Sequence, residues 1–146
     1  QRNHTERSED EAAVLVAVER FFESMTANDS AGARAVLDPA GSFVSVRWNE
    51  DGERVVRRAP NEAYLGSLAT ESETYLERMW DPEVRIHGPI ATVWTPYDFY
   101  VDGVFSHCGV DAFQLLRTDA GWLITGGMYT VERTECPESP LGPPTT

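Results

Sequence analysis

The stretch that decides the fold is WTPYDFYVDGVFSHCGVD, residues 94–111. β-Branched and aromatic residues dominate on both sides of Asp102-Gly103, and this dipeptide is typical of a two-residue hairpin turn. Counting outward from the turn predicts that Asp98 lies opposite His107. The sequence therefore predicts two long antiparallel strands with a defined pairing.

Further segments of the same character surround this hairpin. Turn residues separate strands that are predicted over 42–48, 53–58, 74–87, 90–101, 104–117 and 122–132. Helices are predicted over 9–27, 30–37 and 61–69, and the first of them repeats its apolar residues every three or four positions. Helices followed by long antiparallel strands predict one α+β domain, in which a curved antiparallel sheet wraps around three N-terminal helices.

This domain is expected to span residues 9–132. Residues 1–8 are polar and are expected to form a flexible N-terminus. Residues 133–146 are expected to be a proline-rich tail outside the fold, because prolines recur throughout their last ten positions.

The charge and the motifs narrow the class of partner. The 146 residues carry 12 basic and 24 acidic side chains, a net charge of −12. Nucleic acids and anionic membranes bind clustered Lys and Arg, so neither is an expected partner. No P-loop, dinucleotide-binding, GxSxG or HExxH motif is present, and neither a metal nor another cofactor is expected. This charge balance suits a protein that meets small or neutral ligands, and a small hydrophobic or aromatic molecule is the expected partner.

The start of the chain and its two cysteines bear on location. The chain begins with Gln1 and further polar residues, as after removal of a secretory signal or at a chosen cloning boundary. Cys108 and Cys136 could form one disulfide if the protein is exported. A periplasmic or secreted location is expected slightly in preference to a cytoplasmic one.

The hairpin register places ionisable side chains on one face. Asp98 opposite His107 would fix the imidazole tautomer and raise its basicity. Asp111 lies roughly 13 Å from His107, but a curved sheet could direct both at one ligand. The predicted catalytic residues are His107 as base, Asp98 as its partner, and Asp111 or Tyr100 as donor to an oxyanion. The alternative is a purely structural Asp98–His107 pair, and a bulge in the hairpin would exchange the two faces beyond it.

The same face carries large side chains that are expected to bind a ligand. The turn at 118–121 continues the register into the last strand. The predicted substrate-binding residues are Trp94, Tyr100, Phe105, Phe113, Trp122 and Met128. Glu77 and Arg78 point to opposite faces of their strand; one could enter the cavity, but a solvated edge is favoured.

The opposite face of the sheet is expected to be unusually apolar. It would carry Val93, Tyr97, Phe99, Val101, Val110 and Tyr129. Because no remaining helix can cover it, a homodimer through this outer face is favoured. The alternative is that the tail folds back over the face, which a bond between Cys136 and Cys108 would assist.

The hairpin 94–111 resembles the nuclear transport factor 2-like superfamily, and more narrowly its SnoaL-like and lumazine-binding branch. Gly121-Trp122-Leu123-Ile124, Tyr129-Thr130-Val131-Glu132 and the amphipathic opening helix strengthen the resemblance, which covers residues 9–132. The resemblance implies a cone-shaped α+β barrel with a pocket at its wide end.

The resemblance does not decide the function, because relatives include ketosteroid isomerases, dehydratases, epoxide hydrolases, polyketide cyclases and domains without catalysis. The first helix has Phe21 and Phe22 where the steroid-isomerase pattern expects a tyrosine, and the Asp-Arg-Asp set of epoxide hydrolases has no evident counterpart. One hypothesis is a cofactor-independent isomerase, dehydratase or cyclase that uses His107 as base. The alternatives are a non-catalytic binding domain for a small aromatic or polyketide-like ligand, and a dimeric structural domain.

Overall fold

The computed structural model describes residues 4–145, with side chains described from residue 9 onward. Its helices are α1 (His4–Thr26), α2 (Ser30–Arg34) and α3 (Asn61–Leu68). Its strands are β1 (Leu37–Trp48), β2 (Arg54–Pro60), β3 (Tyr75–Met79), β4 (Glu83–His87), β5 (Ile90–Val101), β6 (Val104–Thr118) and β7 (Gly121–Val131). The predicted α+β class is confirmed.

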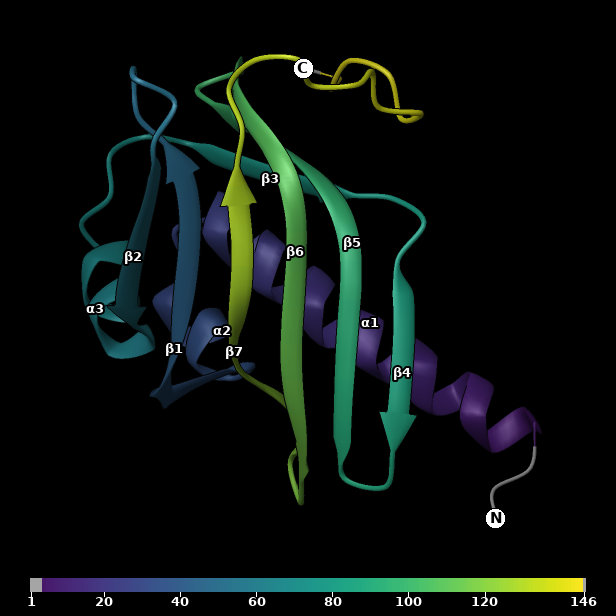
Figure 1. Cartoon of the computed structure of the whole chain (residues 1–146). Helices are drawn as coiled ribbons and strands as arrows, with labels where there is room; N and C mark the ends of the chain where they lie inside the picture. The colour runs from purple at the N-terminus through teal and green to yellow at the C-terminus, as the bar shows by residue number, and fades with distance from the viewer. Residues whose placement is uncertain (1–3, 146) are drawn as a thin grey trace.

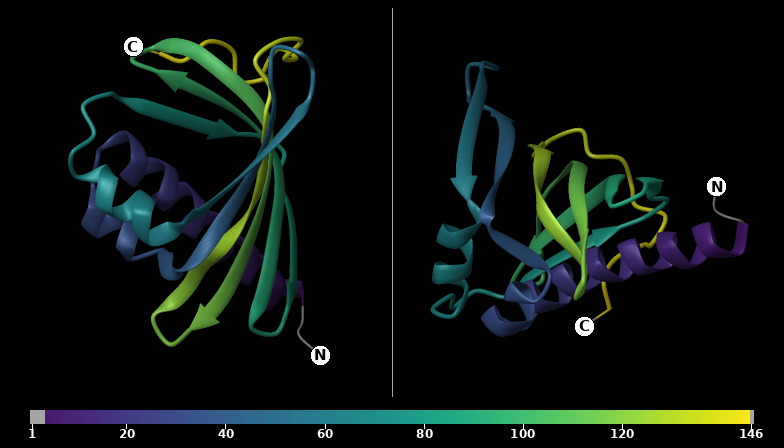
Figure 2. Two further views of the ribbon diagram at one scale, coloured as in Figure 1. Left: turned by 60° about the vertical axis from the view of Figure 1, so that its left-hand side comes forward. Right: turned by 90° about the horizontal axis from the view of Figure 1, so that it is seen from below.

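The strands form one curved sheet in the order β2-β1-β7-β6-β5-β3, and β4 also pairs with β5. The pairings are antiparallel except that of β1 with β7, which is parallel and departs from the predicted all-antiparallel sheet. The helices lie on one face of the sheet (Figure 1), and the sheet curls over them (Figure 2). The concave face therefore surrounds a space that the helices close on one side.

The first helix packs its apolar stripe against this concave face. Val14, Val18, Phe21, Phe22 and Met25 are all buried in the core. The helix starts at His4, ahead of its predicted start at residue 9, while residues 1–3 of the expected flexible segment lie outside the described part. No helix in the described residues is long and apolar enough to cross a membrane.

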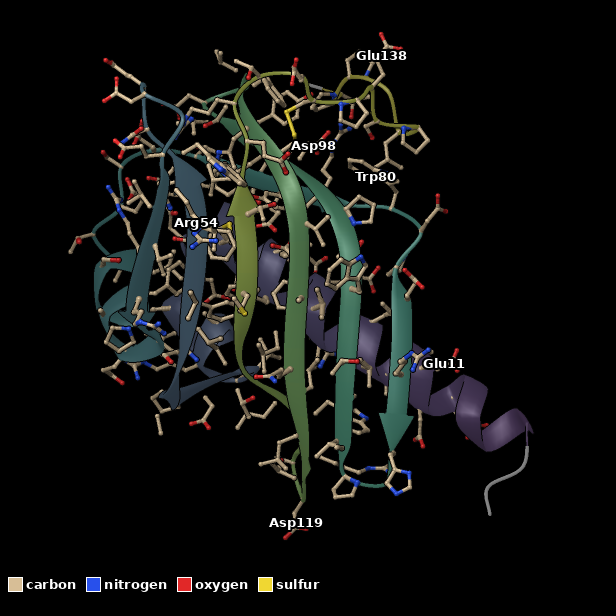
Figure 3. All side chains as sticks on the ribbon, viewed as in Figure 1. Glu11, Arg54, Trp80, Asp98, Asp119 and Glu138 are labelled. Atoms are coloured by element: carbon tan, nitrogen blue, oxygen red, sulfur yellow. A yellow bond between two sulfur atoms is a disulfide. The ribbon has the colours of Figure 1, made fainter. Side chains whose placement is uncertain are left out.

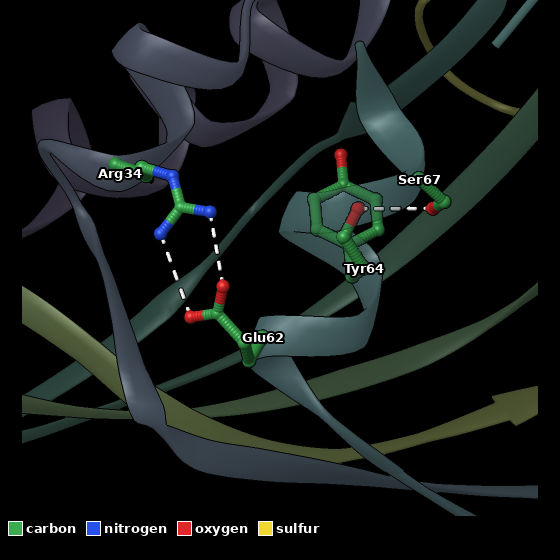
Figure 4. Close-up of polar contacts among 4 residues, drawn as sticks. All are labelled: Arg34, Glu62, Tyr64 and Ser67. Carbon is green, nitrogen blue, oxygen red and sulfur yellow. Dashed lines mark hydrogen bonds and ion pairs between the residues drawn. The ribbon is translucent and has the colours of Figure 1, made fainter. Parts of the chain in front are cut away.

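The two short helices are fixed to each other. Asp29 caps α2 by accepting a hydrogen bond from the Gly32 amide at 3.0 Å. Arg34 at the end of α2 forms an ion pair of 3.0 Å with Glu62 in α3 (Figure 4). This ion pair is exposed and contributes little to stability, while the Tyr64 side chain of α3 lines the concave side of the sheet.

The segment predicted as one strand over 74–87 is two strands. Asp81 has a positive φ of 48°, and Pro82 follows it, so the backbone turns between β3 and β4. The two strands pair with different halves of β5, β3 with its end and β4 with its beginning. This break brings β3 across the upper part of the concave face.

Two β-bulges correct the predicted register. Val101 pairs with Val104 and Tyr100 with Phe105, as predicted, but Phe99 pairs with His107, which leaves Ser106 as an extra residue. A second shift at Thr125 lies between β6 and β7. Asp98 consequently pairs with Cys108, and the prediction that it lies opposite His107 is wrong.

The bulges exchange the two faces of β5 relative to β6. Val93, Tyr97, Phe99 and Tyr129 were predicted on the outer face, but Val93 and Tyr97 are buried, and Tyr97, Phe99 and Tyr129 line the concave side. Trp94 and Met128, which were predicted to face the ligand, are 56% and 53% exposed. On β6 the predicted His107, Asp111 and Phe113 line the concave side, whereas Phe105, ahead of the bulge, is 43% exposed. The predicted faces of β5, and of β7 beyond Thr125, are inverted.

Glycines make the second bulge possible. Gly126 and Gly127 have φ values of 156° and 157°. A Cβ on Gly126 would collide with the Ser42 carbonyl of β1, and one on Gly127 with the Ala112 carbonyl of β6. Both neighbouring strands therefore approach β7 where a side chain would otherwise lie.

The end of the chain is tied to the sheet by a disulfide between Cys108 and Cys136 (Figure 3). Cys108 and Glu132 also exchange backbone hydrogen bonds of 2.9 and 2.8 Å. Residues 133–145 contain no helix or strand of their own. The predicted tail is thus attached to the domain near the outer side of Asp98.

Candidate active site

A cavity of about 280 Å³ lies between the concave face of the sheet and the helices. The helices contribute Phe21, Met25, Asn61 and Tyr64 to its wall. The sheet contributes Phe43, Arg47, Tyr75, Glu77, Tyr97, Phe99, His107, Asp111, Phe113 and Tyr129 among others. Apolar walls with a few inward polar groups are typical of a small-molecule site.

The aromatic side chains of the cavity wall pack against one another. Phe113 meets the rings of Phe21 and Phe43 edge-on, at centroid distances of 6.3 and 6.0 Å. Phe43 also contacts Tyr129 edge-on at 6.3 Å. Such contacts restrict ring rotation, so the cavity offers flat surfaces in fixed orientations.

Two carboxyl groups meet inside this cavity, Glu77 from β3 and Asp111 from β6. Burial raises the pKa of Asp111 to about 7, while a hydrogen bond with Glu77 acts in the opposite direction. Burial, the charge of Asp111 and the same hydrogen bond together raise the pKa of Glu77 well above its usual range. Near neutral pH the pair therefore holds a proton, which lies on Glu77.

The hydrogen bonding around Asp111 agrees with this assignment. Asp111 is only 4% exposed, and no hydroxyl, amide or cation of the described residues donates to its Oδ2 atom. A buried carboxylate without a donor is costly. A proton on Glu77 supplies the missing hydrogen bond, so one carboxyl group is an acid and the other a base.

His107 lines the cavity as a neutral imidazole. Burial, with the charges of Arg133 and Arg47, lowers the pKa of His107 to about 4. Its Nδ1 lies 2.9 Å from Ser106 Oγ, which accepts a hydrogen bond of 3.1 Å from Arg133. The hydroxyl proton is then directed at Nδ1, which leaves the ring proton on Nε2. A pKa this low makes His107 a weak base, and its Nε2 proton can be donated to a ligand.

Two further donors face the cavity with unused hydrogen-bonding capacity. Arg47 donates through Nη2 to Ser45 Oγ at 3.0 Å, but its buried Nε has no partner among the described residues. The buried hydroxyl of Tyr64 also lacks a partner there, and burial raises the pKa of Tyr64. By contrast, the hydroxyl of Tyr97 donates to the Thr130 carbonyl. Arg47 and Tyr64 are therefore available to a ligand.

The fold of this chain has counterparts among solved protein structures. No protein-family model matches the chain, and no curated protein matches it significantly. A protein of unknown function from Mycobacterium tuberculosis superposes with a TM-score of 0.71 and 13% identity, over 97% of this chain and 80% of its own. An NTF2-like superfamily protein from Salmonella enterica serovar Typhimurium gives 0.67 and 15%, over 89% and 96%.

A third similar structure is provisionally named a dehydratase of the NTF2-like family, from Streptomyces avermitilis. It has a TM-score of 0.65 and 20% identity, over 86% of this chain and 96% of its own. The chain has the nuclear transport factor 2-like fold. At such low identity the likeness concerns the fold, and the narrower SnoaL-like and lumazine-binding assignment stays a prediction.

Several predicted site residues lie inside the NTF2-like cone and others do not. His107, Asp111 and Phe113 line the cavity. Trp94, Met128 and Phe105 are exposed outside it. Trp122 is buried in the core, where the Arg117 guanidinium lies 5.4 Å from its ring centroid. Tyr100 lies against Arg78 outside the cavity, at 5.3 Å from its ring centroid.

Asp98 has a structural partner instead of His107. It accepts hydrogen bonds from Arg78 Nε at 3.0 Å and from Arg78 Nη2 at 2.6 Å. Asp98 is 4% exposed and lies on the face of the sheet away from α1 (Figure 3). This bidentate ion pair joins β3 to β5 from outside the NTF2-like cone, and Asp98 cannot orient His107.

The sequence did not identify Glu77, Arg47 or Tyr64 as site residues. Glu77 carried the only signal, since alternation along its strand placed Glu77 and Arg78 on opposite faces. Arg47 lies near the end of a strand whose other charged residue, Asp38, is at its beginning, and Tyr64 lies in a short helix. Their convergence depends on the curvature of the NTF2-like sheet and on the position of α3.

Proposed function

We propose that the protein is a cofactor-independent proton-transfer enzyme of the isomerase or dehydratase kind. The observation that carries this proposal is the Glu77–Asp111 pair, which shares a proton inside a largely aromatic cavity. A general base is most effective when its pKa lies near the working pH, and burial raises the pKa of Asp111 to about 7. The pair supplies an acid and a base at one place.

In the proposed reaction, Asp111 removes a proton from a carbon next to a carbonyl group. The electron pair of that C–H bond moves to the carbonyl oxygen and forms an enolate. In a dehydration the enolate collapses, the C–O bond of a β-hydroxyl group breaks, and Glu77 donates its proton so that water leaves. In an isomerisation the substrate is a β,γ-unsaturated ketone: the carbonyl group re-forms, the C=C bond moves to the α,β-position, and Glu77 donates its proton to the γ-carbon. A positioned acid or base typically contributes about 10²- to 10⁴-fold to the rate.

A solvent-exchange experiment tests this proposal with simple compounds in place of the natural substrate. Small aromatic ketones and β-hydroxyketones are incubated with the protein in deuterium oxide, and loss of the α-proton signal is followed by NMR. We expect the wild type to catalyse exchange on some of these compounds, and Asp111→Asn to lower that rate at least about 100-fold. Asp119→Asn is the matched control, because Asp119 lies in the exposed β6–β7 turn. Absence of exchange, or equal exchange by Asp111→Asn, overturns the proposal.

A non-catalytic binding domain is the second candidate, and the preformed aromatic wall favours it. Flat surfaces in fixed orientations bind planar molecules without any proton transfer. A binding domain would retain aromatic ketones with unchanged α-protons. Asp111→Asn would then leave both the ligand and its affinity unchanged.

We also propose that a second copy of the chain covers the outer face of the sheet. The correct residues of that face include Trp94, Val110, Met128 and Val46, instead of the predicted Tyr97, Phe99 and Tyr129. The row that contains Val46, Val110 and Pro96 carries no acidic side chain, although the chain has 24, while the neighbouring row through Met128 and Trp94 ends at Glu83 of β4. Two copies can therefore meet along the first row without like-charge repulsion, and a two-fold contact is the usual solution.

A further inference from the structure

Arg47 is a cation in the cavity wall without an acidic partner among the described residues. Its guanidinium donates one hydrogen bond, to Ser45 Oγ, and its buried Nε donates none. Taking a guanidinium out of water is costly unless an acceptor replaces the water. The chain has 24 acidic side chains and a net charge of −12, yet none of the described ones forms an ion pair with Arg47.

The Glu77–Asp111 pair does not neutralise Arg47. The charge of Arg47 lowers the pKa values of Tyr97, His107 and Tyr129, which therefore lie near it. The pKa values of Glu77 and Asp111 respond to burial and to each other. No ion pair of the described residues joins Arg47 to either carboxyl group. The cavity thus has an acidic place, where the two carboxyl groups meet, and a basic place at Arg47, and both lie near Tyr97 and Tyr129.

His107 adds a second donor to the basic place. Because Ser106 occupies Nδ1, the ring donates through Nε2. The ring is fixed by stacking on Phe99, with centroids 4.7 Å apart and planes 18° from parallel. A carboxylate has two oxygens, so one cation and one neutral N–H donor can each satisfy one of them.

We infer that the cavity takes a small aromatic molecule carrying one carboxylate, which Arg47 and His107 hold while the ring lies against Phe43, Phe113 and Tyr129. This inference deepens the proposed function, since it names the substrate class of the same site. Arg47 selects the carboxylate, and the aromatic wall selects a flat body. The reacting carbon then lies away from Arg47, towards Glu77 and Asp111.

Binding of 1-naphthoate and of its neutral counterpart 1-naphthamide tests the inference by calorimetry. We expect the wild type to bind the carboxylate at least about tenfold more tightly than the amide. Arg47→Met should remove this preference and leave the amide affinity within about twofold. His107→Phe preserves an aromatic ring but not the donor, and should weaken only the carboxylate, by about two- to tenfold.

Arg54→Met is the matched control. Arg54 pairs with Trp48 and therefore lies on the opposite face of the β1–β2 hairpin from Arg47 (Figure 3). It removes the same charge, so a purely long-range effect would appear in both variants. Arg47→Lys keeps the charge but not the Nε donor, and it should bind the carboxylate with an intermediate affinity. This variant replaces Arg47→Met in the test if Arg47→Met does not fold.

Equal affinity of the wild type for the two ligands, binding of neither, or undiminished carboxylate binding by Arg47→Met overturns the inference. These failures are distinguishable from failure of the proposed reaction. If Asp111-dependent deuterium exchange persists while the carboxylate preference is absent, only the substrate class is wrong. If the preference depends on Arg47 while Asp111→Asn exchanges like the wild type, only the proton-transfer proposal is wrong.

Discussion

The carboxyl pair in the cavity should make the stability of the protein depend on pH, and this can be measured without a substrate. A buried carboxyl group whose pKa is raised on folding favours the protonated state. Its contribution to stability is fully present below the unfolded pKa and is lost as the pH rises through the folded pKa. For Asp111 that window runs from the ordinary value of 3.8 to about 7.

The size of the effect follows from this window. Between about pH 5.5 and about pH 8.5 the unfolded chain keeps Asp111 ionised, while the folded chain loses its proton near pH 7. Linkage then predicts that the free energy of unfolding falls by about 2 kcal/mol over this interval. Glu77 adds to this fall, because its pKa is raised well above 4.5 in the folded protein while the unfolded chain ionises it over the whole interval. The value of about 2 kcal/mol is therefore the share of Asp111 alone and a lower limit for the pair.

His107 acts in the opposite direction and must be separated. Its pKa is lowered to about 4 in the folded protein, so its contribution to stability is lost as the pH falls below its unfolded value near 6.5. The free energy of unfolding of the wild type, plotted against pH, therefore contains two contributions of opposite sign, one from the carboxyl pair and one from His107. The difference between the wild type and Glu77→Gln/Asp111→Asn isolates the carboxyl pair, because His107 is present in both.

Urea unfolding followed by tryptophan fluorescence gives this difference at each pH. We expect the stability of the wild type relative to the double variant to fall by at least about 2 kcal/mol as the pH rises from about 5.5 to about 8.5, since both carboxyl groups act in this direction. Asp119→Asn removes an exposed carboxylate and should show a constant difference. Parallel curves for the wild type and the double variant, or a difference of the opposite slope, would refute a buried proton-sharing pair.

Three further predictions concern the outer side of the sheet. Replacing Cys108 and Cys136 by serine should lower the free energy of unfolding by about 3 to 4 kcal/mol, because the bond closes a loop of 28 residues; an unchanged urea midpoint would contradict this. Asp98→Asn should cost about 3 to 5 kcal/mol by leaving Arg78 unpaired, yet leave deuterium exchange by the folded protein unchanged. Val110→Arg should convert a dimer into monomers in light scattering, and a monomeric wild type at micromolar concentration would exclude the dimer.

The sequence was sufficient to predict most of the fold. Asp102-Gly103 fixed the hairpin, and β5 has the predicted bounds of 90 and 101. The apolar stripe of α1 is buried as its spacing predicted. The predicted segment 74–87 failed because Asp81-Pro82 interrupts a run of otherwise strand-like residues. Local composition therefore predicted most helices and strands, but it missed the turn inside the strand-like segment 74–87.

The candidate site was harder to predict, because face assignments depend on register. A single extra residue exchanges the two faces of one strand relative to its neighbour. Neither Ser106 nor Thr125 has a sequence signature for a bulge, although the Gly126-Gly127 pair beside Thr125 indicates a bend. His107, Asp111 and Phe113 were placed correctly because β6 itself was oriented correctly. Asp98 and Trp94 were inverted because their strand was counted across the bulge.

The bulge at Ser106 accounts for both the location and the chemistry of the site. By shifting β5 against β6, it places Tyr97 and Phe99 inside the cone and Asp98 outside, where Arg78 satisfies it. The extra residue is itself a serine whose hydroxyl contacts Nδ1 of His107. Without the bulge, a carboxylate opposite His107 would raise the imidazole pKa and make it a base. With the bulge, His107 stays neutral, and the pair formed by Glu77 and Asp111 is the one with a pKa suited to the proposed acid–base role.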